Sequence, residues 1–275
     1  MKFPLTDSQF SDLKEIILLA GEEVRRIYES RDYKVELKED DSPLTAADKA
    51  SQDIILKGLG KLFPKTPIIS EESKDIPYEK RKYFEYFWLV DPLDGTKEFI
   101  SRNGEFTINV SLIHKNIPVI GLVYLPAKEM LYFAQKGKGA FKEEKGEEEK
   151  LSVYIEKRDK IIILRSRSHS MPEEEGIVSG LGTVEEIYAG SALKFCLVAE
   201  GIADIYIRTC GSMEWDTAAG QCIVESAGGG VYDFRGDSLR YNKSSLLNPA
   251  FYCFNQSEDL EKRLKRSLSE ISFKV

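Results

Sequence analysis

The residues with the clearest chemical potential in this sequence are two aspartates in one short turn. An apolar run ends at Asp91, and Asp94 follows shortly after it. Pro92 fixes its own φ angle and Gly95 permits a tight bend, so the turn can aim both carboxylates and the Leu93 carbonyl at one point. Hard oxygen ligands in this arrangement suit Mg²⁺. The alternative is an ordinary surface turn, because proline and Asp-Gly pairs are common in turns.

Further acidic residues could complete a metal site. Glu71 and Glu72 follow a short apolar run, and Asp48 lies near the start of a predicted helix. Asp216 follows Trp215 at the start of another predicted helix. Each position also has a simpler explanation. The two glutamates could be solvated charges, Asp48 could face solvent, and Asp216 could only cap its helix.

These motifs occur in an order that is typical of one group of enzymes. An acidic pair before Asp-Pro-x-Asp-Gly-Thr and a late Trp-Asp pair resemble the signatures of the inositol monophosphatase-like superfamily. The match covers most of the chain, and the ordered set is much more specific than any single motif. The resemblance implies an α/β fold of the layered αβαβα sugar-phosphatase type. It also implies a magnesium-dependent phosphomonoesterase.

The resemblance implies two bound Mg²⁺ ions and is compatible with a third, weaker one. Such ions would neutralise a phosphomonoester dianion and activate the water that attacks it. Asp91 would be shared by both ions, Glu71 would belong to the first ion, and Asp216 would belong to the second. The implied metal ligands are Glu71, Asp91, the Leu93 carbonyl, Asp94 and Asp216.

The same resemblance implies the catalytic residues. Asp48 and Thr96 would orient and deprotonate the attacking water. Glu72 would support this group or a third, weaker ion near Glu71 and Asp48. The backbone N–H groups of Gly95 and Thr96 would grip phosphate oxygens if these residues open a helix.

The C-terminal half indicates which phosphomonoester is cleaved. Residues 166–169, 190–201 and 213–220 resemble the CysQ-type 3'(2'),5'-bisphosphate nucleotidases. The implied reaction is hydrolysis of adenosine 3',5'-bisphosphate to AMP and phosphate, a clearance step for sulfate assimilation, with inhibition by Li⁺. The residues implied to line the nucleotide site are His169, Ser191, Lys194 and Arg208.

Two of these residues are chemically suited to the phosphate that is not cleaved. Lys194 and Arg208 can form charge-assisted hydrogen bonds to it, although they could also be ordinary surface charges. His169 could donate to a phosphate or ribose oxygen, or it could cap a turn. The group's Tyr-Pro-Arg and Gly-Pro-Thr sequences appear here as residues 206–208 and 210–212, Tyr-Ile-Arg and Cys-Gly-Ser. These departures affect the expected shape of the base-binding side.

Two other functions stay open on this evidence. An inositol or sugar monophosphatase could use the same scaffold, but it would not need Lys194 and Arg208 for a second phosphate. A catalytically inactive module that binds a phosphorylated ligand is the other alternative. The intact acidic set argues against it.

The elements that must position these residues follow from hydrophobic periodicity and turn signals. Expected helices span residues 6–28, 45–62, 191–200, 215–227 and 257–271. Expected strands span residues 67–70, 86–90, 106–114, 119–124, 130–134, 161–164 and 203–207.

The chain is expected to form two halves. Residues 1–150 would carry most metal ligands in an α+β half, and residues 151–275 would carry Asp216 and the substrate-binding residues in an α/β half. The charged stretch 142–150 could mark the boundary or form a solvated hairpin tip.

The composition limits the partners and the compartment. The 275 residues are 42% hydrophobic and 31% charged with a net charge of −7, which disfavours a nucleic-acid-binding surface. Four widely spaced cysteines favour buried free thiols. Acidic residues interrupt the first 19 positions, and no run reaches the roughly 20 apolar residues of a membrane span. We therefore expect a cytoplasmic enzyme with a small phosphorylated nucleotide substrate. An oligomer stays open.

Overall fold

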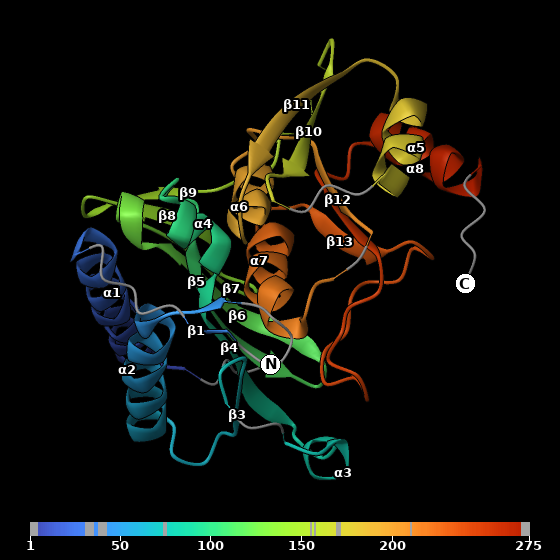
Figure 1. The fold of residues 1–275 in the computed structure, drawn as a ribbon. Helices are drawn as coiled ribbons and strands as arrows, with labels where there is room; N and C mark the ends of the chain where they lie inside the picture. The colour runs from blue at the N-terminus through green and yellow to red at the C-terminus, as the bar shows by residue number, and fades with distance from the viewer. Residues whose placement is uncertain are drawn as a thin grey trace.

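Helices and sheets alternate as αβαβα layers in the computed structural model of the chain (Figure 1). The structure describes residues 5–30, 36–37, 43–73, 76–154, 156, 158–168, 172–209 and 211–270. The observed layering confirms the fold class expected from the sequence.

The first sheet has seven strands in the order β3-β4-β5-β6-β7-β8-β9. β3 and β4 run parallel, and the other neighbours run antiparallel. The strands are β3 (Ile68–Ser70), β4 (Tyr86–Asp94), β5 (Thr107–His114), β6 (Ile117–Leu125), β7 (Met130–Gln135), β8 (Gly139–Glu144) and β9 (Glu147–Lys150).

The second sheet has five strands in the order β11-β10-β12-β14-β13. β10 runs parallel to both of its neighbours, whereas β14 runs antiparallel to β12 and β13. The strands are β10 (Ile161–Ser166), β11 (Val184–Ala189), β12 (Ile205–Arg208), β13 (Gly230–Asp233) and β14 (Phe251–Phe254).

Pairs of helices form the remaining layers. α1 and α2 cover one face of the first sheet, α6 and α7 lie between the sheets, and α5 and α8 cover the far face of the second sheet (Figure 1). These helices are α1 (Asp7–Ser30), α2 (Ala46–Leu62), α5 (Pro172–Leu181), α6 (Leu193–Ala199), α7 (Glu214–Ser226) and α8 (Glu258–Glu270). Smaller elements are β1 (Glu36–Leu37), β2 (Pro43–Leu44), α3 (Tyr78–Arg81), α4 (Thr96–Ser101) and the 3₁₀ turn η1 (Pro126–Lys128).

Side-chain alternation along the strands explains why both faces of each sheet are covered. In β4, Trp88 and Val90 pack toward α1 and α2, while Phe87 and Leu89 pack toward the layer between the sheets. Successive strand residues point to opposite faces, so a continuous apolar run requires a buried layer on each side. In β12 the same alternation directs Tyr206 toward the layer between the sheets. Ile205 and Ile207, on either side of it in the strand, pack toward α5 and α8.

The structure confirms most of the expected elements and extends several of them. β4 continues past the expected end at residue 90 and reaches Asp94, with a shift of register between Asp91 and Asp94. The parallel strand β11 and helix α5 were not expected. Residues 142–150 belong to the β8–β9 hairpin, which agrees with the second of the two alternatives for this stretch.

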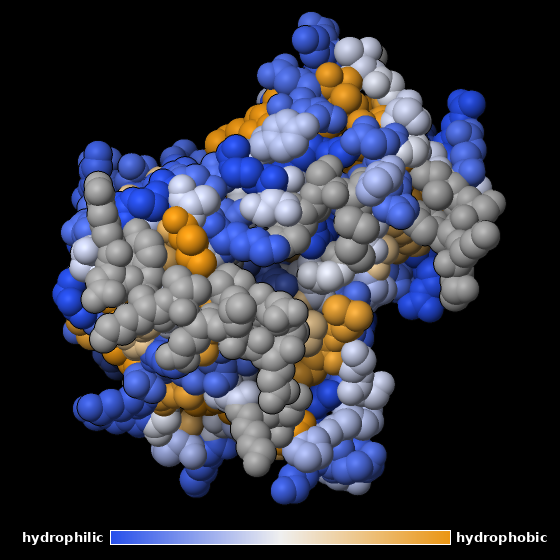
Figure 2. All heavy atoms as spheres, viewed as in Figure 1, coloured by the Kyte–Doolittle hydropathy of each residue, from blue (hydrophilic) through white to orange (hydrophobic). Residues whose placement is uncertain are grey.

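Three further expectations concern the boundary between the halves, the surface and the cysteines. The first sheet ends at Lys150 and the second begins at Ile161. The division of the chain into two halves near residue 150 stays a prediction. On the face shown in Figure 2, hydrophilic residues predominate and apolar residues form separate patches. Among the described residues, no helix combines the length and apolar character needed to cross a membrane. Cys196, Cys222 and Cys253 are buried free thiols, while Cys210 lies outside the described residues.

Candidate active site

Three carboxylates from distant parts of the chain meet at one end of the first sheet. Glu71 directly follows β3, and its backbone N–H donates to the Val90 carbonyl of β4 at 3.1 Å. This parallel pairing places Glu71 beside Asp91, and Asp216 reaches the same point from the first turn of α7. One ligand oxygen from each of the three carboxylates lies within 4.8 Å of the others. The spacing suits a shared cation.

A register shift inside β4, between Asp91 and Asp94, takes the place of the turn that the sequence predicted after residue 90. Gly95 has a φ of 86°, a left-handed conformation that glycine adopts without strain. The Leu93 N–H donates to Asp91 Oδ1 at 3.1 Å, and the Ser51 hydroxyl of α2 donates to the Pro92 carbonyl at 2.7 Å. These bonds fix the bulge against the helix behind it.

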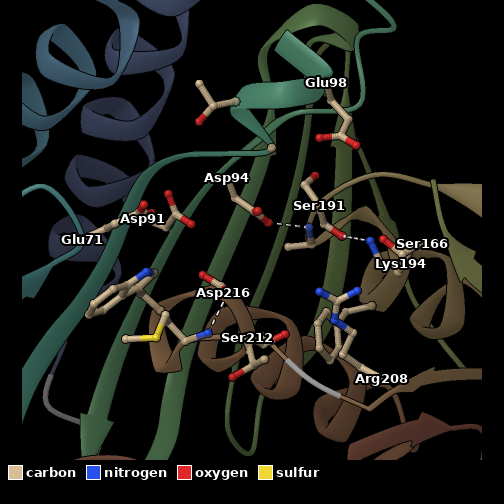
Figure 3. Close-up of a pocket in the computed structure, with 18 of the residues that line it drawn as sticks. Glu71, Asp91, Asp94, Glu98, Ser166, Ser191, Lys194, Arg208, Ser212 and Asp216 are labelled. Atoms are coloured by element: carbon tan, nitrogen blue, oxygen red, sulfur yellow. Dashed lines mark hydrogen bonds between the residues drawn. The ribbon is translucent and has the colours of Figure 1, made fainter. Parts of the chain in front are cut away.

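Asp94 points away from this tight group toward the second half of the chain. Its Oδ2 accepts the Ala192 N–H at 2.8 Å and the Asn109 side-chain amide at 3.3 Å. Figure 3 shows Asp94 between the acidic group and Ser191. Its assignment as a ligand of a second ion stays a prediction.

The electrostatics of the acidic group suit a bound cation. Burial raises the pKa of Asp91 and Asp216 well above the usual range, and the neighbouring carboxylates, including Glu71, raise it further. Burial also raises the pKa of Asp94 to about 6, against the lowering effect of the Lys194 charge. A divalent cation would reverse this repulsion and keep the carboxylates ionised. The residues present therefore fit the Mg²⁺ that the sequence predicted.

We expect the metal-free protein to lose stability as the pH rises through this range. A carboxyl whose pKa is raised on folding holds more protons in the native state, so the free energy of unfolding falls with rising pH between the two pKa values. For Asp94 this interval runs from 3.8 to about 6, and Asp91 and Asp216 extend it upward. Thermal unfolding with EDTA or Mg²⁺ at about pH 5 and about pH 8 measures the effect. Mg²⁺ should raise Tm more at the higher pH; equal increments would contradict the charge argument.

Asp48 serves both as a helix cap and as a neighbour of Thr96. Its Oδ2 accepts the Thr45 N–H at 2.7 Å, which closes a capping box at the start of α2. Its Oδ1 accepts the Thr96 hydroxyl at 3.4 Å. Asp48 is 1% exposed, so the alternative of a solvent-facing carboxylate is wrong.

Asp216 combines two functions in a similar way. Its Oδ2 accepts the backbone N–H of Met213 at 2.7 Å, at the start of α7. The cap expected as a simpler explanation is therefore present, and the carboxylate also belongs to the acidic group. In Asp48 and Asp216 alike, a backbone hydrogen bond fixes the rotamer of the side chain that faces the site.

Two cations lie at the other end of the same cavity. Lys194 and Arg208 are 4% and 8% exposed, so the alternative of ordinary surface charges is wrong. Lys194 Nζ donates to the Ser191 carbonyl at 2.7 Å and lies 5.2 Å from the centre of the Tyr206 ring. Burial lowers the pKa of Lys194 to about 8, although the Asp94 carboxylate raises it.

One cavity of about 290 Å³ joins the acidic and basic ends. Figure 3 shows Glu71 and Asp91 on one side of it and Lys194 and Arg208 on the other. Ten of the thirteen predicted site residues line it: Glu71, Asp91, Leu93, Asp94, Gly95, Thr96, Ser191, Lys194, Arg208 and Asp216. Asp48 is not part of the lining that the described residues form and contacts it through the Thr96 hydroxyl.

Some predicted residues are placed elsewhere. The Glu72 side chain is not part of the lining among the described residues, and its backbone carbonyl accepts the Gln52 amide at 3.1 Å. His169 lies outside the described residues, so its predicted role is neither supported nor contradicted. Thr96 does open a helix, α4, behind Gly95, as expected.

The sequence did not identify several lining residues. Glu98 is 4% exposed and accepts the Ser168 hydroxyl at 2.5 Å. The available signal was a glutamate in the first turn of a short helix, two residues after the Asp-Gly-Thr motif. Ser166 ends β10 and Ser212 precedes α7. Both lie in segments whose sequences were compared with the nucleotidase group, 166–169 and 210–212, but neither serine was predicted as a site residue. The additional polar residues of the lining include Lys97, Glu98, Ser166, Ser212 and Thr217.

Comparisons with known proteins identify the family to which the chain belongs. The Inositol monophosphatase family model matches residues 8–272. The 3'(2'),5'-bisphosphate nucleotidase CysQ of Salmonella typhimurium is 44% identical over 234 residues, which cover 84% of this chain and 94% of that protein.

Solved structures show the same likeness. CysQ from Bacteroides thetaiotaomicron, a bacterial member of the inositol monophosphatase family, superposes with a TM-score of 0.79 at 42% identity, covering 91% of this chain and 98% of that one. The extragenic suppressor protein suhB from Bartonella henselae superposes with a TM-score of 0.81 at 25% identity, covering 96% and 99%.

Proposed function

Because the chain belongs to the inositol monophosphatase family, we propose that it is a magnesium-dependent phosphomonoesterase that hydrolyses adenosine 3',5'-bisphosphate to AMP and phosphate. The similarity to CysQ nucleotidases supports this substrate over an inositol or sugar phosphate. Clearance of this nucleotide for sulfate assimilation and sensitivity to Li⁺ are finer parts of the same proposal.

One observation carries the proposal: a single cavity has a cation-binding acidic end and a buried basic end. Glu71, Asp91 and Asp216 form the first, and Lys194 and Arg208 form the second. A substrate with two phosphates can place the phosphate that is cleaved at the acidic end and the other at the basic end. An inositol monophosphate has no group that would use both cations.

The protein residues prepare the reaction by position and charge. Bound Mg²⁺ would neutralise the phosphate dianion and make water a better nucleophile. Asp48 accepts the Thr96 hydroxyl, and in this proposal the pair orients a water molecule and takes its proton at Asp48 Oδ1. Lys194 and Arg208 hold the second phosphate throughout the reaction and thereby fix the bond to be broken.

A phosphate-release assay on a substrate panel tests the proposal. The panel contains adenosine 3',5'-bisphosphate, its sulfated analogue, inositol 1-phosphate and fructose 1,6-bisphosphate, each with Mg²⁺ or with EDTA. The highest kcat/KM should occur with the bisphosphate nucleotide, and EDTA should abolish turnover. Preference for inositol 1-phosphate would replace the proposed substrate, and absence of any turnover would favour the inactive binding module.

Substitution of Arg208 distinguishes the two ends of the cavity. Arg208→Ala should raise KM for adenosine 3',5'-bisphosphate more than it lowers kcat, because contact with the retained phosphate exists in ground and transition states alike. The expected loss in kcat/KM is about 10- to 100-fold, the contribution of one charge-assisted hydrogen bond. The loss should shrink with 3'-AMP, which lacks the second phosphate.

The matched control for this variant is Arg266→Ala, which removes an exposed arginine from α8 on the far side of the second sheet. Both kinetic constants of the control should equal those of the wild type. An equal loss on the bisphosphate and on 3'-AMP in Arg208→Ala would show that Arg208 does not distinguish them.

A further inference from the structure

The segment that joins β11 to α6 has an unfavourable backbone conformation. Ser191 has a φ of 42°, in the left-handed region that side-chain-bearing residues rarely adopt. Such a residue costs of order 1–3 kcal/mol and persists only where surrounding contacts impose it. Gly190 approaches its neighbours so closely that an added Cβ would lie 2.7 Å from the Glu105 carbonyl oxygen. The segment is therefore held in place by contacts outside itself.

This segment connects the two ends of the cavity. The Ala192 N–H donates to Asp94 Oδ2 at 2.8 Å, beside the acidic group. The Ser191 carbonyl accepts Lys194 Nζ at 2.7 Å, at the basic end (Figure 3). Consecutive backbone groups thus set the orientation of one predicted metal ligand and of one predicted phosphate-binding cation. A small change at Ser191 would disturb both.

Glu105 supplies contacts that hold the segment. Its Oε2 accepts the Gly190 N–H at 2.8 Å, and its backbone carbonyl accepts the Ser191 hydroxyl at 2.9 Å. The Glu105 side chain is 15% exposed and does not line the cavity among the described residues. It can therefore act on the site through the segment that it binds and through its charge, which raises the pKa of Lys194 against the lowering effect of burial.

Arg167 completes this arrangement from the end of β10. It binds Glu105 through two parallel hydrogen bonds of 2.8 Å each, a geometry that fixes both side chains. Its Nη2 also donates to the Tyr188 carbonyl of β11 at 2.7 Å. Burial alone would raise the pKa of Glu105. The Arg167 hydrogen bonds and charge, together with the Gly190 N–H, more than offset burial, so the net pKa lies below its usual value and the carboxylate is ionised.

We propose that Glu105, braced by Arg167, is a positioning residue that holds residues 190–192 in the conformation needed by both Asp94 and Lys194. The proposal rests on the proposed function, because it assigns Asp94 to the metal site and Lys194 to the retained phosphate. It adds a single contact on which metal affinity and substrate affinity both depend.

Substitution of Glu105 should weaken both ends of the site together. Glu105→Ala should raise KM for adenosine 3',5'-bisphosphate and the half-saturating Mg²⁺ concentration, with a fall of about tenfold or more in kcat/KM, since small displacements at a positioned site are costly. Glu105→Gln keeps an oxygen that can accept the Gly190 N–H but loses the charge pair with Arg167. Its effects should be intermediate.

Amide hydrogen exchange of the metal-free protein tests the geometry without any measurement of activity. The informative group is the Ala192 N–H, whose acceptor, Asp94, is unchanged in the variants. Its exchange should be at least about tenfold faster in Glu105→Ala than in the wild type, because release of the segment breaks this bond. Glu185→Ala, an exposed glutamate on β11, is the matched control and should leave the Ala192 exchange rate unchanged.

Two outcomes would overturn the proposal. One is an unchanged Ala192 exchange rate in both Glu105 variants. The other is a lower Tm with unchanged KM and unchanged half-saturating Mg²⁺, which would mean that Glu105 only stabilises the fold. If Glu105→Ala does not fold, Glu105→Gln provides the same measurements. A wild-type protein without phosphatase activity would refute the proposed function, while the exchange experiment would still decide whether Glu105 holds the segment.

Discussion

Replacement of Asp91 by asparagine should abolish most of the magnesium-dependent turnover, with a loss of at least about 100-fold. Asp91 is 1% exposed, and one of its ligand oxygens lies within 4.8 Å of those of Glu71 and Asp216, in agreement with its proposed role as a metal ligand. The substitution removes one negative charge and keeps the side-chain shape. The oxygen of the new side-chain amide can still accept the Leu93 N–H, which Asp91 Oδ1 accepts at 3.1 Å. The measurement is kcat/KM over a range of Mg²⁺ concentrations.

The same variant should be more stable than the wild type when metal is removed. Neighbouring carboxylates raise the pKa of Asp91 together with burial, and loss of its charge relieves that repulsion. Thermal unfolding in EDTA should therefore give a higher Tm for Asp91→Asn, and Mg²⁺ should raise it less than in the wild type. A folded variant with near-normal activity would refute the assignment of Asp91 as a metal ligand.

Replacement of Asp48 by asparagine should lower kcat by about 100- to 10,000-fold, the range expected for loss of a positioned general base. An amide cannot take the proton from water, but its oxygen can still accept the Thr45 N–H and preserve the capping box of α2. KM should change little, because Asp48 is not expected to bind substrate. The experiment measures both constants at saturating Mg²⁺, together with Tm.

Asp53→Asn provides the control for the change at Asp48. Asp53 is exposed on the same helix, so its substitution changes the charge of α2 by the same amount without reaching the site. Its kcat should equal that of the wild type. If Asp48→Asn also retained a normal kcat, the carboxylate would be a helix cap and nothing more.

The layered fold and the metal site could be predicted because their signals are local. Continuous apolar runs such as β4 indicate strands buried on both faces, and the order of the acidic motifs indicates the family. For Asp48 and Asp216, the sequence alone does not separate a role in the site from a simpler structural role. In the structure the Asp216 cap and its site position occur together, because an N-terminal helix position both accepts a backbone N–H and faces the cavity.

The contacts between the halves could not be predicted. The bond between Asp94 and Ala192 joins residues 98 positions apart, and the bond from Arg167 to Glu105 spans 62. Neither pair has a spacing or composition that marks it, because such contacts depend on how the sheets are placed across α7. The positive φ of Ser191 could not be predicted either, because glycine or asparagine is the residue that usually indicates this conformation. β11 was not predicted from the sequence because charged residues interrupt its apolar pattern.

The β8–β9 hairpin gives the first sheet a well-protected border. β9 is the last strand of that sheet, only four residues long, and three of those residues are consecutive glutamates that are exposed. An outermost strand offers unpaired backbone groups to any other extended chain, and short length and charge are two ways to discourage such pairing. A second molecule that approached this border would meet repulsion between identical acidic rows. At high protein concentration, the hairpin therefore opposes growth of the sheet from one molecule into the next.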